Sequence, residues 1–442
     1  MKVTNVDSSL LSGLLERWRP ETHTFHLPVG EMTITLEDVS CLWALPITGV
    51  PVTGMSDGNW EGLVNECLGV GAWDALMKPK KRSSAIQKSG YAINLKSLRN
   101  RFKAMPSGQG EPTPEQIHQY TRAYILDLFG SLLFTDSSGD SVPVMYLQFL
   151  RNLNTPGQYN WGGAVLALLY RNLCWGATRK AKMVKTLAGP VVLLQHWAWS
   201  RLQTGRPCPY QGWAPDWGRP DCQSCPAFGA KWCGALEYKQ PHGKAGVKYF
   251  RNQLQDLREG NVDWEPYKQL WSRMPSRVHQ DAVFFRARVP LVHFWIVEHH
   301  YPDRVMRQFG YRQAIPVLEP LPEDDVRKLH RYVHSSMCTT NWSVEHETYV
   351  TQASDLLNNI VPPDEPFSCD QIESYQRWFH QNCMYNIFEV PQVLDGAMSM
   401  DLDKNDNSEY GYIANGPRNT REVHILDLDS SLLNIQMILC LY

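Results

Sequence analysis

A run of apolar segments at helical spacing between residues 113 and 202 constrains the fold more than any other feature. In the first, Thr113 is placed as an N-cap, Pro114 at the first helical position and Gln116 at the third, and apolar side chains then recur at helical spacing as far as Leu132. Three further apolar stretches, joined by short turns, lie at residues 143–153, 161–175 and 189–202. This part of the chain is therefore predicted to form a helical bundle.

Strand signals are few. Two β-favouring runs flank a Pro28–Gly30 turn and predict a β-hairpin over residues 24–35. Thr35 and Asp38 then have the spacing of an N-cap pair and predict a short helix that stops before Pro46. The fold class predicted is mainly α: a multi-helix globular domain with a small β-hairpin near its N-terminus and few short strands.

The C-terminal half repeats the helical pattern. Helices are expected at residues 247–260, 290–300, 302–310, around 342–350 and at 375–388, with a short strand at 282–289. The chain then divides into an N-terminal helical half at 1–204, a connecting loop rich in Pro, Cys and Trp at 205–245, a C-terminal helical half at 246–390 and an acidic tail, expected to be disordered, at 391–442.

Composition excludes several classes. With 43 Lys and Arg against 45 Asp and Glu the net charge is −2, so no global basic field draws the protein to nucleic acid or to anionic lipid. The N-terminus lacks the apolar centre of a secretory signal, no stretch reaches the length of a membrane span, and eleven cysteines in no secretory context are expected to be reduced. We therefore expect an intracellular protein without a membrane partner.

Two short basic runs stand out locally. The first resembles a nuclear import signal, with a solvated loop as the alternative, and consists of Lys78, Lys80, Lys81 and Arg82. The second precedes a helix and offers a few phosphate contacts, again with a solvated loop as the alternative; it consists of Arg179, Lys180, Lys182 and Lys185.

The connecting loop holds the strongest metal-ligand pattern. Cys222 and Cys225 have the two-residue separation that lets both thiolates reach one tetrahedral zinc. Cys208 and Cys233 complete a possible four-thiolate structural site, with His242 as a spare ligand. The spacings are irregular, so ordinary reduced thiols are the alternative, and no other cofactor is expected.

A second cluster gathers at the end of the long apolar run. Glu298, His299, His300 and Asp303 are the densest group of carboxylates and imidazoles. Adjacent histidines on a helix point about 100° apart and are poor ligands of one metal. Helix-start chemistry after Pro302, with Asp303 paired to Arg304 or Arg307, is the alternative interpretation.

Tryptophans supply the interface candidates. Of the sixteen, Trp161, Trp197, Trp199 and Trp295 lie in apolar helical stretches and are expected in the core. Trp18, flanked by arginines, either packs beneath the hairpin or anchors a partner, and Trp213 and Trp217 in the connecting loop are the other interface candidates.

Several segments resemble the plant mobile domain family, also called aminotransferase-like and found in MAIN-like nuclear proteins. The resemblance covers roughly residues 7–390 and is carried by the segments 14–54, 119–153, 159–174, 193–202, 262–267 and 288–316, together with the spacing of Trp342, His346 and Tyr349. It implies a mainly helical fold, nuclear localisation, a transposon origin, and a role in transposon silencing, gene expression and genome integrity beside nuclear protein partners, among them a phosphatase-related protein. It implies no reaction.

This sequence departs from the family pattern in three places. The family has further helices before the stretch that begins at Leu10, so an N-terminally shortened chain is expected. The segment at 205–245 is richer in Cys and Trp than the family pattern, and the acidic tail has no counterpart in it.

Known catalytic motifs were sought and not found in the sequence. The Gly-Asp and Gly-Asn-His-Glu loops of metallophosphatases, a Schiff-base lysine in a phosphate-binding loop, and the glycine-rich nucleotide motifs do not occur. The leading hypothesis is a non-catalytic nuclear interaction module. The alternatives are a nucleic-acid-binding protein that uses the two basic runs and a metal-dependent enzyme in which Glu298, His299 or His300 meets other ligands across the fold.

Overall fold

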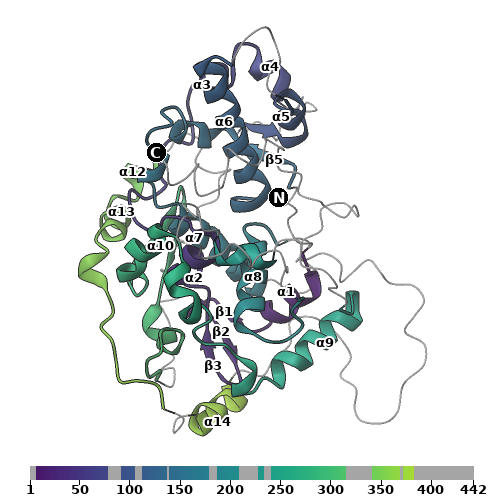
Figure 1. The fold of residues 1–442 in the computed structure, drawn as a ribbon, viewed down its shortest axis with the longest axis vertical. Helices are drawn as coiled ribbons and strands as arrows, with labels where there is room; N and C mark the ends of the chain where they lie inside the picture. Colours follow the sequence, from purple (N-terminus) through teal and green to yellow (C-terminus); the bar gives the residue numbers. More distant parts are fainter. Residues whose placement is uncertain are drawn as a thin grey trace.

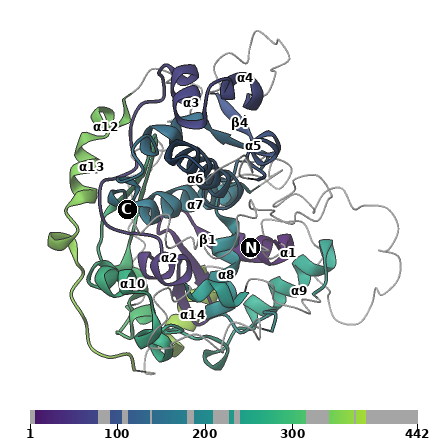
Figure 2. The ribbon, with the colours of Figure 1, turned by 45° about the horizontal axis from the view of Figure 1, so that its top comes forward.

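The computed structural model describes residues 6–77, 91–104, 112–136, 139–178, 187–208, 227–232, 240–314, 341–368 and 372–382. Their fold is mainly helical, with a few short antiparallel strands (Figures 1 and 2). The α-helices are α1 (Ser8–Leu15), α2 (Leu36–Trp43), α3 (Trp60–Leu68), α4 (Ala72–Leu76), α5 (Leu95–Arg101), α6 (Pro114–Leu128), α7 (Trp161–Thr178), α8 (Val191–Arg201), α9 (Gly243–Gln255), α10 (Ser276–Asp281), α12 (Trp342–Glu345), α13 (Glu347–Ser354) and α14 (Ile372–Asn382).

Shorter elements connect these helices. The strands are β1 (Trp18–Arg19), β2 (Thr24–Leu27), β3 (Gly30–Met32), β4 (Ala92–Asn94), β5 (Ser141–Pro143), β6 (Pro290–His293) and β7 (Ile296–His299). One π-helical turn, η1 (Phe129–Leu133), extends α6. The 3-10 segments are η2 (Val144–Phe149), η3 (Pro156–Gln158), η6 (Phe228–Trp232), η7 (Glu259–Asn261), η8 (Lys268–Arg273), η9 (Ala282–Phe284), η10 (Pro302–Phe309) and η11 (Leu357–Asn359).

Two predicted helix starts, at Thr35 and Thr113, are confirmed at atomic level. The Thr35 hydroxyl accepts a hydrogen bond from the Asp38 backbone N–H, and the Asp38 carboxylate accepts one from the Thr35 backbone N–H. Helix α2 therefore begins with a capping box. Thr113 and Gln116 form the same box at the start of α6, with Pro114 in the first turn. These local bonds satisfy backbone N–H groups that an α-helix leaves unpaired at its start.

The predicted hairpin is confirmed and gains a third strand. β2 and β3 pair antiparallel with Phe25 opposite Met32, and β1 joins the free edge of β2 with Trp18 opposite Phe25. The side chains of Trp18, Phe25 and Met32 are buried. This sheet is therefore part of the core.

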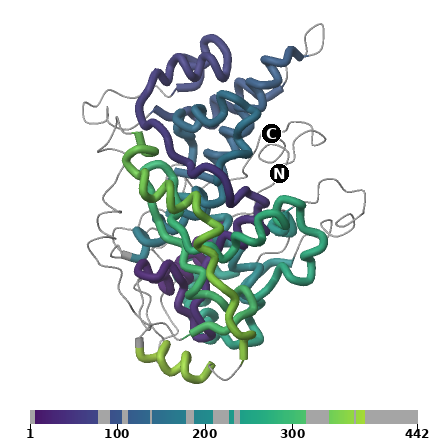
Figure 3. Tube along the Cα trace, turned by 90° about the vertical axis from the view of Figure 1, so that its left-hand side faces the viewer, coloured from purple at the N-terminus to yellow at the C-terminus, as the bar shows by residue number. Residues whose placement is uncertain are grey.

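Helix α7 runs through the centre of the molecule and packs against β6, β7 and α2. Helices α3 to α6 gather at one end of the molecule, at the top of Figure 1, and the three-stranded sheet lies towards the other. Residues 341–368 run along one side of the body (Figures 1 and 3). Helix α1 packs against α9, and one continuous core includes side chains from Leu10 to Trp342. Segments of both sequence halves thus share one core.

Four predicted elements were assigned the wrong secondary structure. The run 290–300, expected as a buried helix, is the β6–β7 hairpin, in which His293 pairs with Ile296 around a turn that places Phe294 at φ 50°. A short apolar run does not distinguish a buried helix from a buried strand by periodicity, and the β-branched residues of this run favour the strand. The expected strand at 282–289 begins instead as η9, and the helices expected at 143–153 and 302–310 are the 3-10 segments η2 and η10.

Within the part of the chain that the structure describes, no helix combines the length and the apolar character that crossing a membrane requires.

Candidate functional site

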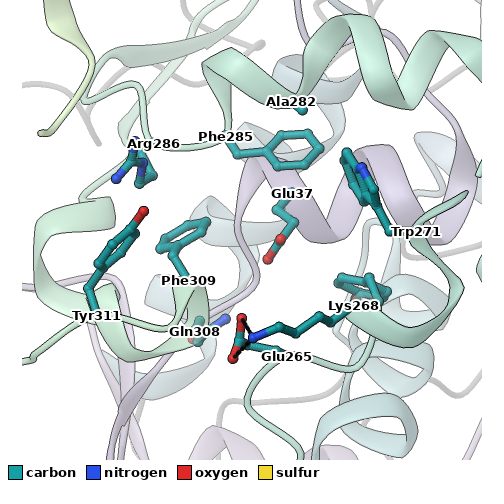
Figure 4. A pocket seen from close by; sticks show the side chains of 11 residues that line it. Glu37, Glu265, Lys268, Trp271, Ala282, Phe285, Arg286, Gln308, Phe309 and Tyr311 are labelled. Carbon is teal, nitrogen blue, oxygen red and sulfur yellow. Dashed lines mark hydrogen bonds and ion pairs between the residues drawn. The ribbon is translucent and has the colours of Figure 1, made fainter. Parts of the chain in front are cut away.

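One pocket combines aromatic rings with charged groups, and we call it the aromatic pocket (Figure 4). It has a volume of about 370 Å³, within the usual range for small-ligand sites. Its lining comes from α2, the chain around η8, the end of α10 with η9, and the end of η10. The residues that matter for its chemistry are Glu37, Glu265, Lys268, Trp271, Phe285, Arg286, Phe309 and Tyr311.

Glu37 lies at the centre of the aromatic pocket, where the first turn of α2 presents it between Phe285, Phe309 and Trp271 (Figure 4). Its Oε2 accepts from Arg201 Nη2 at 3.1 Å, and its side chain is 17% exposed. Oε1 carries no hydrogen bond from any described residue. One oxygen of this carboxylate is therefore available to a ligand.

Arg201 is shared by two carboxylates. Its Nε donates to Asp38 Oδ1 at 2.8 Å, and the Tyr267 hydroxyl donates to the same oxygen at 2.7 Å. Burial and the neighbouring Asp38 raise the pKa of Glu37 to about 8, against the opposing effect of Arg201. Near neutral pH the Glu37 carboxyl therefore holds a proton that an incoming cation can displace.

The remaining charges of the aromatic pocket lie around Glu37. Lys268 Nζ contacts both oxygens of Glu265 at 3.2 Å, which leaves that pair neutral as a unit. The Arg286 guanidinium lies over the Tyr311 ring at 5.0 Å, and its buried Nη1 has no hydrogen-bond partner among the described residues. The aromatic pocket thus offers one available carboxylate oxygen.

The second candidate is a group of polar side chains inside the protein, which we call the buried cluster: His23, Arg171, Cys174 and Glu298. Ligand atoms of His23, Cys174 and Glu298 all lie within 4.8 Å of one another. Glu298 thus meets two other metal-ligand types across the fold, as the metal-dependent alternative requires.

The contacts of the buried cluster do not favour a cation. Arg171 Nε donates to Glu298 Oε1, and His23 Nε2 lies 3.1 Å from Glu298 Oε2, so both carboxylate oxygens already face a positive or donor group. Burial alone would lower the pKa of His23, but the Cys174 and Glu298 contacts raise it to about 10. Glu298 is 2% exposed. A metal ion would have to displace Arg171 from a site without access to solvent.

His299 and His300 do not join this cluster. They end and follow strand β7, where successive side chains point to opposite faces, so the helical geometry expected for them was wrong. His300 Nδ1 pairs with the Ala287 carbonyl at 2.8 Å, and its Nε2 accepts from the Leu36 N–H at 3.4 Å. His299 lines a second pocket, of about 400 Å³, beside Arg288. Burial lowers the pKa of both imidazoles to about 4.

Asp303 follows Pro302 in the first turn of η10, as helix-start chemistry predicts. The ion pair expected with Arg304 or Arg307 was wrong: Asp303 lies 3.4 Å from Arg288, while Arg304 pairs with Glu31. The prediction assumed α-helical spacing, whereas this segment forms 3-10 turns with a break at Val305.

The remaining predicted site residues have different outcomes. Trp18 is 0% exposed and donates to Cys174 Sγ at 3.4 Å, so the prediction that it anchors a partner is wrong and packing beneath the sheet is its role. Cys208 is exposed. The other site residues predicted from the sequence lie outside the described residues: Cys222, Cys225, Cys233, Trp213, Trp217, Lys78, Lys80, Lys81, Arg82, Arg179, Lys180, Lys182 and Lys185.

Sequence reasoning missed the aromatic pocket. Glu37 lies in a helix start that was predicted correctly, but its partner Arg201 is 164 residues away. Phe285, Phe309 and Trp271 come from short 3-10 segments and their flanks, which have no simple periodic signal. No sequence signal pointed to this site.

Comparison with known proteins agrees with the family expectation. Three Arabidopsis thaliana proteins are similar to this chain: a serine/threonine-protein phosphatase 7 long form homolog at 34% identity over 85% of this chain, Protein MAIN-LIKE 2 at 31% over 85%, and Protein MAINTENANCE OF MERISTEMS at 33% over 71%. The matched region makes up 27%, 51% and 59% of these relatives, so the chain spans well under two thirds of their lengths. No solved structure matches it. The family model described as plant mobile domain matches residues 1–380, and the chain belongs to the plant mobile domain family.

Proposed function

We propose that this plant mobile domain is a non-catalytic interaction module of the nucleus. Its transposon origin and its role in transposon silencing, gene-expression control and genome integrity are part of the proposal, as is a phosphatase-related partner. The module has a rigid interior, and its surface provides the contacts.

The observation that carries this proposal is how the buried acids are used. Glu298 is held by Arg171, Asp38 by Arg201, Glu16 by Arg251 and Glu31 by Arg304, and each pair joins segments far apart in the sequence. Acids engaged in this way fix the position of one segment against another and are not available for general acid or base chemistry. The arrangement supports a structural body that presents a surface.

The lengths of the relatives support a portable module. The region similar to this chain is about a quarter of one relative and between half and three fifths of two others. A domain that occurs in chains of such different length combines with different neighbouring segments. One of those relatives is named as a phosphatase homolog, which supports association with that class of protein.

Affinity purification of the tagged full chain from plant nuclei, quantified by mass spectrometry, tests the proposal. The matched control is Trp161→Asp, which places a charge in the centre of the core because Trp161 is fully buried. We expect a defined set of nuclear proteins, including a phosphatase-related one, to be enriched with the native chain and lost with the control. Recovery of chaperones alone with both chains would refute the proposal.

A fluorescent fusion of the full chain tests the location. We expect nuclear signal that becomes cytoplasmic when Lys78, Lys80, Lys81 and Arg82 are replaced by alanine. Nuclear signal that persists after this change would remove the import role of the run, and exclusion of the unchanged chain from nuclei would overturn the proposed location.

The enzyme and nucleic-acid alternatives have their own measurements. Turnover of an aryl phosphate that requires Mn²⁺, and that is lost in a Glu298→Gln chain shown by circular dichroism to be folded, would favour the metal-dependent enzyme. Salt-dependent binding of duplex DNA that Arg179→Ala with Lys182→Ala abolishes would favour the nucleic-acid-binding protein.

A further inference from the structure

The walls of the aromatic pocket suit an organic cation. The rings of Trp271 and Phe285 have centroids 6.3 Å apart and planes at 88°, so they form two walls at a right angle. Phe309 lies across from them (Figure 4). Aromatic faces attract cations through their quadrupole, and sets of such rings are a known way of holding quaternary ammonium groups.

Charge complementarity comes from Glu37. Its carboxyl group lies between these rings, and only one of its oxygens is engaged, by Arg201 at 3.1 Å. Glu265 is already paired with Lys268. A cation that enters between the rings would therefore meet Glu37 as its counter-ion.

The composition of the walls discriminates between kinds of cation. An unmodified lysine ammonium is compact and strongly hydrated, and it needs hydrogen-bond acceptors to replace its water. Between the three rings the aromatic pocket offers one available carboxylate oxygen, because the neighbouring Glu265 is engaged by Lys268. A methylated ammonium is larger and less hydrated, so it loses less hydration free energy on entering such a site.

We propose that the aromatic pocket binds a methylated lysine side chain of a partner protein, with the methylammonium between Trp271, Phe285 and Phe309, beside Glu37. This deepens the proposed interaction function and rests on it, because it names the chemistry of one partner.

The electrostatics give the interaction a pH dependence. Glu37 faces Asp38 and Cys41 on its own helix, Arg201 on α8, and Glu265, Tyr267 and Lys268 from the chain around η8, with Arg286 also lining the pocket. The pKa of Glu37 is raised to about 8, and a bound cation favours the ionised form. Binding therefore releases a proton, and affinity rises as the pH increases from about 6.5 to 9.

The test uses the full chain and fluorescence anisotropy of labelled peptides in which one trimethyllysine or one unmodified lysine is flanked by Gly and Ser. We expect the trimethylated peptide to bind at least tenfold more tightly than the unmodified one, and tetramethylammonium chloride to compete. Competition without any peptide binding would show a site for small quaternary ammonium compounds and would overturn the assignment to a protein partner.

Variants localise the binding. Phe309→Leu and Trp271→Leu should each reduce the affinity for the trimethylated peptide roughly tenfold. Glu37→Gln should reduce the affinity for this peptide and remove the rise of affinity with pH. The matched control, Glu347→Gln, changes an exposed carboxyl on α13 and should leave affinity unchanged. Circular dichroism confirms that each variant is folded.

Equal affinity for the two peptides, or full affinity in folded Phe309→Leu and Trp271→Leu, would overturn the assignment. These outcomes are distinct from failure of the interaction function. If nuclear partners are recovered with Phe309→Leu as well as with the native chain, the interaction function is supported and the methyl-lysine site is refuted. If neither chain recovers partners, the proposed interaction function itself is refuted.

Discussion

Two glutamates, Glu298 in the buried cluster and Glu37 in the aromatic pocket, are each held by an arginine from a helix far away in the sequence. Glu298 is 2% exposed, and both of its oxygens face Arg171 or His23. Glu37 is 17% exposed, and one of its oxygens is free of any described donor. The same residue type with the same partner type thus stabilises the fold in one place and is available to a ligand in the other. Solvent access makes the difference.

The largest expected effect is the loss of the Glu298 charge. Glu298→Gln leaves the Arg171 guanidinium without its counter-ion inside the protein, and breaking a buried pair in this way costs about 3–5 kcal/mol of unfolding free energy. Glu37→Gln should cost under about 1 kcal/mol at pH 7, because Glu37 already holds a proton there. Urea denaturation measures the loss of unfolding free energy in both variants. Equal losses would contradict the difference drawn between the two glutamates.

Alkaline pH should affect the buried cluster next most strongly. The folded pKa of His23 is about 10, against a usual value of 6.5, so its contribution is complete below pH 6.5 and is lost as the pH rises through 10. The loss is at most about 1.4 kcal/mol per pH unit in that window. The unfolding free energy of the native chain should fall between pH 6.5 and 10. The part of this decrease that comes from His23 should be absent in His23→Gln. An identical slope in both chains would contradict the assignment.

Glu37 should titrate in a lower window and with a smaller effect. Its folded pKa of about 8 lies above the usual 4.5, so its contribution is complete below pH 4.5 and is lost as the pH rises through 8. The unfolding free energy of Glu37→Gln relative to the native chain should therefore increase between pH 5 and 9. Carboxyl-region infrared difference spectra of the two chains would locate the titration directly, and a midpoint near 4.5 would refute it.

Zinc should have the smallest effect on the buried cluster. His23, Cys174 and Glu298 present ligand atoms within 4.8 Å of one another, but Arg171 occupies the carboxylate. We expect equimolar Zn²⁺ to leave the unfolding midpoint of a Cys208→Ser, Cys222→Ser, Cys225→Ser, Cys233→Ser chain unchanged, since only a ligand that binds the native state raises it. Stoichiometric zinc in that chain by metal analysis would show a buried metal centre.

Local signals were sufficient where the structure depends on neighbours in the sequence. The capping boxes at Thr35 and Thr113 and the turn at Pro28–Gly30 were all predicted and found. Their bonds join residues within a few positions of each other, so the sequence pattern contains the whole interaction. The prediction of a helix at 290–300 was wrong because apolar periodicity in so short a run does not distinguish a helix from a strand, whereas pairing across the turn at Phe294 forms two strands.

The amino-acid sequence by itself determined the helical class, the capped starts of α2 and α6, the first hairpin and the family resemblance, because periodicity and capping are local properties. The tertiary structure alone decided that Glu298 is enclosed with Arg171 and His23, while Glu37 lies between Phe285 and Phe309 in a pocket. Burial and charge pairing depend on side chains that meet across more than one hundred residues, and these contacts set both the pKa of a carboxyl group and its access to a ligand.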